Sequence, residues 1–457
     1  MLHVTSAERV LVDAATERPG TDGPLVVDDG APDVTSLDAS GCVVTPGLVN
    51  AHHHLLQSAF RTLPGTRGVP MAQWLPTMAA AYDGAGHDPE LYGAAAAVGA
   101  AESLLSGVTT VADHHLNWPH DVDAERTVDL ARATAAAVRT VGARLVLVRG
   151  SAREDAARAA RSADAIVRAL LPDGAARAGV SDDGMLQLAV GPAGVHSDDE
   201  ATFSELGAVA AEHGLRRRTQ ANEQVDTAIA LERYGRRPVD LLEAWGWLAP
   251  DVTVAHLCDV TDDEIARLAA AGVTATHAPG CDVPMGWGVA PVARMLDAGL
   301  TVGLGTSGGG SNDAGHLLAD ARLAMQVSAL VGPQLPARTV LGMATAGSAA
   351  GLGRSELATL GPGTAGDLCV WDVSGVADAG VADPVAGLLW AAPGRRPRHV
   401  VVGGRVVVRD YALVDADERE IVANVRTRLG RTPRVRASTA QVRRSPGRSQ
   451  RAGASEA

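Results

Sequence analysis

The sequence predicts an α/β fold, in which a (β/α)8 barrel is accompanied by a small β-sandwich domain. Short apolar runs alternate with longer Ala- and Leu-rich stretches of helical periodicity, which is typical of repeated strand–helix units. Both ends of the chain instead alternate short β-like segments with Gly and Pro turns. We therefore expect the barrel over residues 46–354 and a sandwich built from residues 1–45 and 355–430.

The apolar runs give the expected barrel strands in order, and their uniform apolarity is typical of a parallel sheet covered on both faces. The helical stretches between them include 88–107 and 261–272. The strands are expected within 42–52, 107–115, 144–150, 186–196, 216–223, 252–257, 273–279 and 301–308.

Nearly every run ends in a polar residue. Catalytic groups of a barrel enzyme lie at the carboxyl ends of its strands. Histidine at several of these ends therefore predicts a functional pocket there. The end residues are His52 and His54, Asp113 with His114 and His115, Arg149, His196, Glu223, His256, His277 and Ser307.

Composition restricts the classes of partner. The formal charge of −13 argues against nucleic acid as a partner of the folded body, and no apolar run is long enough to cross a membrane. Four scattered cysteines without CxxC spacing, and a first segment without an export signal, predict a cytoplasmic protein. All 40 basic residues are arginines, which rules out a Schiff-base lysine or a carbamylated lysine between two metals. The arginine-rich stretch 431–457 predicts a disordered basic tail.

Four stretches of the chain resemble the amidohydrolase superfamily. They are "VVTPGLVNAHHHLLQSAFR", "ESLLSGVTTVADHH", "VAHLCDVTDDEIARLAAAGVTATHAP" and "GGSNDAGHLLADARLAM". Within the superfamily they are similar to the branch of 8-oxoguanine deaminase, guanine deaminase and s-triazine hydrolase. The resemblance covers about residues 1–430 and implies the barrel and sandwich expected above, a small nitrogen heterocycle as substrate, and a homodimer.

The resemblance also implies a site for one zinc or iron ion with four ligands. His52 and His54 match the two histidines of the family's HxH motif. The third ligand, a histidine, corresponds to Gln220, and the fourth, an aspartate, corresponds to Ser307. An amide oxygen and a hydroxyl are weak zinc ligands, and the family aspartate also serves as the general base. We expect no metal, or one Zn²⁺ or Fe²⁺ bound weakly.

The resemblance assigns the remaining candidate residues. Glu223, His256 and His277 match positions that exchange protons with the substrate or face its ring, and they are the expected catalytic residues. The expected substrate-binding residues are Gln57, Trp74, Asp113, His114, Gln220 and Ser307.

Three hypotheses remain open from the sequence. The first is an enzyme that acts on a purine-, pteridine- or triazine-like ring through a changed, metal-independent acid–base reaction: hydrolysis, or a lyase, cyclisation or tautomerisation step. The second is an ordinary metal-dependent aminohydrolase, with zinc held by His52, His54, His256 and Gln220. The third is a catalytically silent protein that keeps the ligand pocket.

Overall fold

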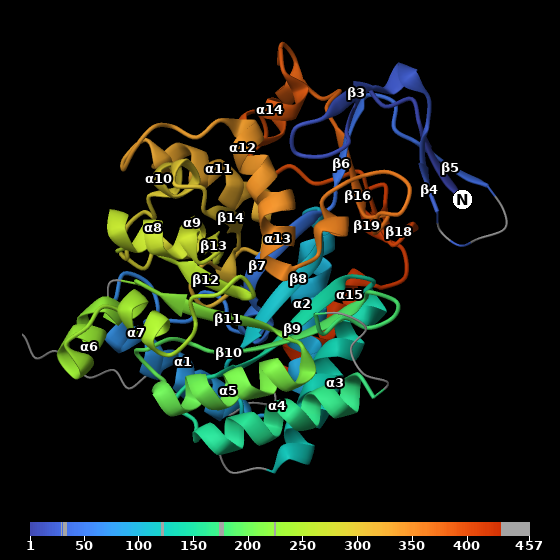
Figure 1. Cartoon of the computed structure of the whole chain (residues 1–457). Helices are drawn as coiled ribbons and strands as arrows, with labels where there is room; N and C mark the ends of the chain where they lie inside the picture. The colour runs from blue at the N-terminus through green and yellow to red at the C-terminus, as the bar shows by residue number, and fades with distance from the viewer. Residues whose placement is uncertain (29, 31–33, 120–122, 173–177, 224, 431–457) are drawn as a thin grey trace, which may run out of the picture.

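The computed structural model describes residues 1–430 except 29, 31–33, 120–122, 173–177 and 224. The predicted tail at 431–457 lies outside the described residues. A parallel barrel forms the body of the molecule, and β-structure from both ends of the chain lies beside it (Figure 1). No helix among the described residues has the length and apolarity needed to traverse a bilayer.

The barrel strands follow one another around the sheet in chain order, each parallel to its neighbour. β14 pairs with β13, and β15, two residues further along the chain, pairs with β7. These two strands are pieces of one eighth strand, which closes the barrel. The strands are β7 (Leu48–His54), β8 (Val108–His115), β9 (Arg144–Ser151), β10 (Leu186–Pro192), β11 (Arg216–Ala221), β12 (Val252–His256), β13 (Thr274–His277), β14 (Thr301–Leu304) and β15 (Ser307–Gly308).

The helices that cover the barrel begin at residues suited to that role. Asp123, Asp155 and Asp199 each accept a hydrogen bond from a backbone N–H of the first turn, and Thr261 forms a capping box with Glu264. The helices are α1 (Met71–Ala85), α2 (Pro89–Leu105), α3 (Ala124–Val141), α4 (Ala156–Leu170), α5 (Glu200–His213), α6 (Val225–Tyr234), α7 (Pro238–Ala244), α8 (Asp262–Ala270), α9 (Pro279–Asp282), α10 (Val292–Asp297), α11 (Leu317–Ser328), α12 (Ala337–Gly342), α13 (Ser348–Leu352), α14 (Pro384–Trp390) and α15 (Glu418–Gly430).

Both ends of the chain contribute to the second region. A seven-stranded sheet has the order β19-β18-β17-β16-β6-β2-β3, and a three-stranded sheet has the order β4-β1-β5. Apolar side chains of the two sheets form one buried cluster, as expected of a sandwich. The strands are β1 (Leu2–Thr5), β2 (Arg9–Leu11), β3 (Glu17–Pro19), β4 (Leu25–Val27), β5 (Thr35–Asp38), β6 (Cys42–Pro46), β16 (Leu368–Asp372), β17 (His399–Val402), β18 (Arg405–Arg409) and β19 (Ala412–Leu413).

The fold corrects one expectation about the strands. The run at 42–52 is not one strand, because the chain passes from the seven-stranded sheet to the barrel at Gly47. A Cβ at Gly47 would lie 2.2 Å from Oγ1 of Thr109, so only glycine fits against β8 at this crossing.

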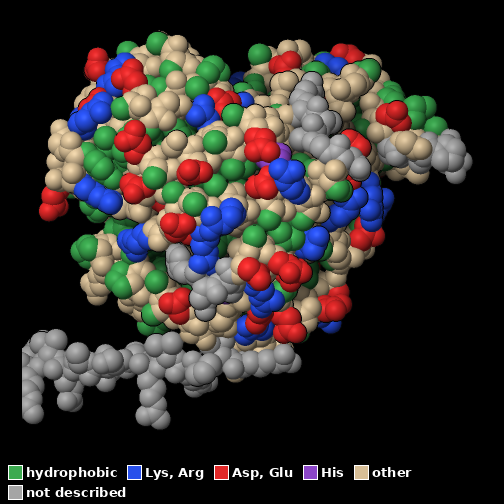
Figure 2. All heavy atoms as spheres, turned by 60° about the horizontal axis from the view of Figure 1, so that its bottom comes forward, with side chains coloured by type: hydrophobic (Ala, Val, Ile, Leu, Met, Phe, Trp, Pro, Cys, Tyr) green, Lys and Arg blue, Asp and Glu red, His purple; other side chains and the backbone are tan. Residues whose placement is uncertain are grey.

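Side chains of both charge signs are interspersed over the face shown in Figure 2. No broad basic patch is visible on that face, which agrees with the acidic composition of the chain.

Candidate functional site

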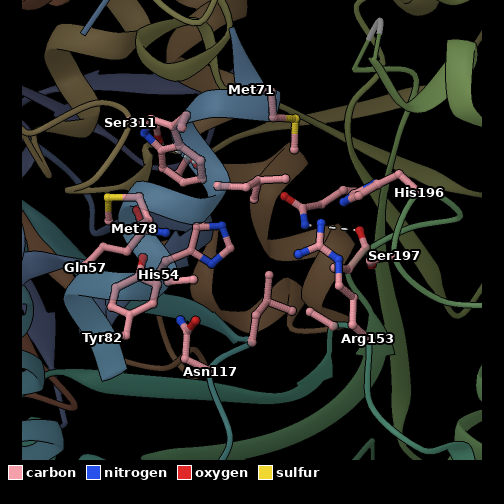
Figure 3. Close-up of a pocket in the computed structure, with 18 of the residues that line it drawn as sticks. His54, Gln57, Met71, Met78, Tyr82, Asn117, Arg153, His196, Ser197 and Ser311 are labelled. Carbon is pink, nitrogen blue, oxygen red and sulfur yellow. Dashed lines mark hydrogen bonds between the residues drawn. The ribbon is translucent and has the colours of Figure 1, made fainter. Parts of the chain in front are cut away.

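A cavity of about 460 Å³ opens among the carboxyl ends of the barrel strands. Figure 3 shows His54, Gln57, Met78 and Tyr82 on one side, with Arg153, His196 and Ser197 opposite them. A cavity of this size accommodates a small molecule rather than a polymer. Its lining also includes Met71, Trp74, Leu75, Asn117, Trp118, Gln220, Glu223, Cys281, Trp287, Ser307 and Ser311.

Helix α1 supplies the apolar wall of the cavity. Met71, Trp74, Met78 and Tyr82 recur every three or four residues, so they lie on one face of the helix, and all four are buried. Flat aromatic and flexible thioether side chains suit the faces of an aromatic ring. Of these four residues only Trp74 was predicted from the sequence, although the helical spacing of the others was visible there.

Gln57 and Trp74 position the backbone that follows the eighth strand. Gln57 Oε1 accepts a hydrogen bond from the Gly310 N–H at 2.9 Å, and Trp74 Nε1 donates to the Gly310 carbonyl at 3.1 Å. A Cβ at Gly308 would lie 2.0 Å from Gln57 Oε1, so this approach requires glycine. Both side chains line the cavity as expected, and both also order the loop that carries Ser311.

Glu223 presents a carboxyl group in the cavity wall just after β11. Asn222 adopts a left-handed backbone conformation (φ 57°), held by hydrogen bonds from its N–H to Asp226 Oδ2 (2.8 Å) and from its Nδ2 to the Asp259 carbonyl (2.9 Å). Glu223 is only 1 % exposed, and its Oε2 is buried without a hydrogen-bond partner among the described residues. Burial raises the pKa of Glu223, and the charges of His256 and His196 lower it in part. The protonated form of this carboxyl group is therefore more favoured than it is for a glutamate exposed to water.

His256 lies behind Glu223 and is held from both ring nitrogens. Its Nδ1 is 2.6 Å from Asp282 Oδ1, and its Nε2 is 3.1 Å from Gln220 Oε1 and 3.7 Å from Glu223 Oε1. Gln220 is oriented by its Nε2, which donates to the Ala193 carbonyl at 3.1 Å, so its Oε1 is left as an acceptor for His256. Burial alone would lower the pKa of His256, but the charge of Asp282 and the hydrogen bond to it, with the charge of Glu223, raise it. Both contacts favour the imidazolium.

The strand ends that carry these groups share an unusual backbone feature. His256 and Ser307 have φ values of 76° and 53°, in the left-handed region that non-glycine residues rarely adopt. Arg153, two residues after β9, has φ 58°. Such conformations are typical of functional sites, where the surrounding structure compensates the strain.

The histidines of β7 differ from His256 because burial keeps them neutral. His54 Nδ1 donates to the His114 carbonyl at 2.7 Å, and burial lowers the pKa of His54 to about 4. Burial and the neighbouring His54 and His256 hold the pKa of His52 well below its ordinary value. The Nε2 of His52 is buried without a partner among the described residues. Its ring centroid lies 4.8 Å from that of His54 and 5.2 Å from that of His256.

Some of the expected site residues line the cavity and others lie behind its wall. His54, Gln57, Trp74, Gln220, Glu223 and Ser307 line it. The structure does not place the other five in the lining: His52, Asp113, His114, His256 and His277.

Asp113 and His114, which were expected to bind substrate, lie outside the cavity lining. Asp113 Oδ1 accepts the Leu55 N–H at 2.8 Å, and its Oδ2 lies 3.2 Å from His115 Nδ1. His114 Nε2 donates to the Gly191 carbonyl at 3.0 Å. Asp113 thus holds the backbone that follows β7, and His114 reaches from β8 to the carbonyl of Gly191 in β10; neither residue is part of the cavity lining.

His277 also lies behind the cavity wall. Its Nδ1 is 3.7 Å from Asp282 Oδ2, and neither atom has a hydrogen-bond partner among the described residues. Burial lowers the pKa of His277 to about 4, so it is neutral at physiological pH. His277 packs beside the carboxylate that holds His256 and is not part of the cavity lining.

Asp282 was missed in the sequence. It is fully buried in the one-turn helix α9, where it faces both His256 and His277. An acidic residue five positions after His277 was the available signal, but only the turn after β13 brings its carboxylate back toward β12.

The donors at the expected metal position fit a catalytic zinc poorly. The candidate donors are two imidazoles, the amide of Gln220 and the hydroxyl of Ser307. The amide oxygen already forms a hydrogen bond with His256, and the hydroxyl lies 3.4 Å from Ser311 Oγ. Within the described part of the chain, two groups of three His, Cys, Asp or Glu bring ligand atoms within 4.8 Å of one another. These are His256–Cys281–Asp282 and Asp164–Glu212–His213, and neither contains His52 or His54.

Residues 43–407 match the model of the amidohydrolase family. The chain belongs to the amidohydrolase family. This amidohydrolase is 34% identical to 8-oxoguanine deaminase from Pseudomonas aeruginosa, over 88% of this chain and 93% of the relative. It is 29% identical to an isoxanthopterin deaminase from an unknown prokaryotic organism, over 93% of this chain and 94% of the relative.

Solved structures agree with this assignment. Atrazine chlorohydrolase from Arthrobacter aurescens TC1, complexed with zinc, superposes with a TM-score of 0.82 at 33% identity. The match covers 94% of this chain and 100% of the other. Because its curated relatives are deaminases and hydrolases, this amidohydrolase is an enzyme. The family, the barrel and the branch expected from the sequence motifs are confirmed.

Proposed function

We propose that this amidohydrolase acts on a purine-, pteridine- or triazine-like nitrogen heteroaromatic by acid–base catalysis that does not depend on a tightly held metal. One observation carries the proposal. Glu223 presents a buried carboxyl group of raised pKa in a cavity whose opposite wall is aromatic and apolar, and His256 lies 3.7 Å behind it. The names of the relatives support the substrate class, since they act on oxopurine, pterin and triazine rings.

The proposed reaction begins with proton transfer from Glu223 to a ring nitrogen. This transfer makes the neighbouring ring carbon electrophilic, so that a water oxygen can bond to it. The carboxylate of Glu223 then accepts a proton from the added water. The bond between the ring carbon and the exocyclic group then breaks, and this group leaves with the second proton of the added water. If the group is an amine, it leaves as ammonia. His256 is a positioning residue in this scheme, because it lies behind the wall and stabilises the carboxylate form of Glu223 electrostatically.

The α1 wall and the eighth-strand loop orient the ring. Trp74 and Met78 contact its faces, and Gln57 keeps Gly310 and Ser311 at the cavity edge. Gln220 is held by Ala193 and His256, so it presents a fixed amide to the substrate.

The test joins substrate screening to metal analysis. Protein purified without chelator is expected to hold much less than one zinc or iron per chain by elemental analysis. Turnover is followed by ultraviolet absorbance over purines, pterins and triazines, before and after treatment with a chelator. Turnover that survives chelation supports the proposal, and near-stoichiometric metal lost together with activity would contradict it.

A second candidate function is the ordinary metal-dependent aminohydrolase. Two observations favour it: the buried Nε2 of His52 has no partner among the described residues, and the similar atrazine chlorohydrolase structure is complexed with zinc. In that case His52 and His54 would be ligands, and adding zinc to the chelator-treated protein would restore activity.

A further inference from the structure

The interior of the barrel below the cavity holds a buried arginine. Arg218 lies on β11 two residues before Gln220, so both side chains point to the same, inner side of the strand. Arg218 is only 3 % exposed, and its Nη2 donates to the carbonyl of Ala51, the residue before His52. Within the described residues, its Nη1 has no hydrogen-bond partner.

No carboxylate forms an ion pair with Arg218 among the described residues, which is unusual for a buried guanidinium. Arg144 and Arg149, the other two fully buried arginines on barrel strands, are each paired with an acidic side chain at 2.9 and 2.7 Å. A guanidinium remains protonated at neutral pH, so Arg218 brings a positive charge into this interior. That charge is uncompensated where the inner face of the barrel meets the histidines.

Two histidines lie close to this position along the chain and in space. His52 directly follows Ala51, whose carbonyl accepts the hydrogen bond from Arg218, and the His52 ring centroid is 5.8 Å from that of His114. His114 donates from Nε2 to Gly191, so its neutral ring leaves a lone pair on Nδ1, which is buried without a partner. His52 Nε2 is also without one. Lone pairs of neutral imidazoles are stabilised by a nearby cation, whether it is a metal ion or a guanidinium.

We infer that Arg218 is the permanent cation of this barrel interior and that its charge opposes the binding of a divalent metal at His52 and His54. This inference rests on the proposed function, since it gives a reason for a metal-poor site. A positive charge within a low-dielectric interior repels a divalent ion more strongly than the same charge would in water. Arg218 is therefore a specificity-determining residue: it selects against metal rather than touching the substrate.

The test compares two arginines of the same strand. Arg218→Met removes the inner charge and keeps a long apolar side chain. Arg217→Met is the matched control, because Arg217 lies on the outer face of β11, where it pairs with Asp251 at 2.7 Å and stacks on Trp247. Zinc affinity is measured by competition with a chromophoric chelator, and the fold of each variant is checked by circular dichroism.

Arg218→Met is expected to bind zinc about 10- to 100-fold more tightly than the wild type, whereas Arg217→Met should not change the affinity. An unchanged affinity in folded Arg218→Met would overturn the inference. If that variant does not fold, Arg218→Gln replaces it, and the same comparison is made in a Gln220→His background, where a third imidazole makes binding easier to measure.

The outcomes for the two proposals are separable. A wild-type protein saturated with zinc overturns both the proposed metal-independent reaction and the role of Arg218. A metal-poor wild type whose Arg218→Met variant gains no affinity overturns only the role of Arg218. Elemental analysis of the wild type decides the first question, and the ratio of the two zinc affinities decides the second.

Discussion

The barrel strand ends around the cavity hold histidines in opposite electrostatic states. On β7 and β8, His54 and His114 are buried, donate to backbone carbonyls and have pKa values lowered to about 4 and about 3. On β12, His256 is equally buried, but Asp282 raises its pKa. A backbone carbonyl that accepts a hydrogen bond from a histidine determines which ring nitrogen carries the proton. A carboxylate in the same place also favours the positively charged form of the ring.

This difference assigns distinct roles to residues of one type. The neutral histidines of β7 and β8 present lone pairs and fix the shape of the strand ends. His256 on β12 instead carries a proton beside Glu223. Family resemblance alone treats all of these histidines as site residues, so it does not distinguish the two states.

The largest effect is expected for Glu223 and His256. Glu223→Gln and His256→Asn should each lower kcat/KM about 10²- to 10⁴-fold on any substrate found, because the first removes the group that transfers the proton and the second removes the charge that stabilises its carboxylate form. Stopped assays with circular dichroism separate loss of chemistry from loss of fold. His115→Asn is the control outside the cavity lining and should be much milder. Near wild-type rates in both variants would refute the assignment of Glu223 and His256.

A smaller effect is expected when only the charge of His256 is changed. Asp282→Asn keeps a polar partner at Nδ1 but removes the carboxylate that raises the pKa of His256. The rate should fall about 10- to 100-fold at neutral pH, and the alkaline limb of the kcat/KM profile should move to lower pH. A profile whose limb stays in place would show that His256 does not act as a cation.

The smallest effect is a difference in the pH dependence of stability. The folded pKa of His114 is lowered from 6.5 to about 3, so its contribution to stability is present above pH 6.5 and is lost as the pH falls toward 3. The folded pKa of His256 is raised, so its contribution is present below pH 6.5 and is lost as the pH rises through the folded value.

Urea denaturation from pH 5 to pH 9 measures both trends. His114→Asn should reduce the acid-side loss of unfolding free energy by about 2 kcal/mol between pH 6.5 and pH 5. His256→Asn should instead flatten the alkaline side. Identical slopes for the two variants would mean that both histidines share one charge state, which would contradict the comparison.

Strand order and strand ends could be predicted from the sequence because apolar runs and polar end residues are local patterns. The same reasoning placed Glu223 and His256 on neighbouring strands, where the structure has them paired through β11 and β12. Local patterns do not say toward which side a terminal side chain turns. Asp113, His114 and His277 therefore share the strand ends but not the cavity.

The remaining features depend on side chains that meet across long stretches of sequence. Asp282 contacts His256 because a one-turn helix brings it back toward β12. In the α1 wall, Trp74 forms a hydrogen bond with Gly310, which is more than two hundred residues away in the chain. A buried arginine in a strand looks like any surface cation until the inner face of the barrel is known. Arg218 could therefore not be recognised from the sequence as a charge inside the barrel.

The closing strand has a consequence for biosynthesis. Asn50 and Thr306, which join β7 to the end of the barrel, are 256 positions apart. A ribosome must therefore release most of the chain before the first strand can meet its last neighbour. Until then the growing sheet has two open edges of apolar parallel strands, which are prone to pair with other chains. The cavity, whose wall includes Ser307 on the closing strand, is completed only when those edges are joined.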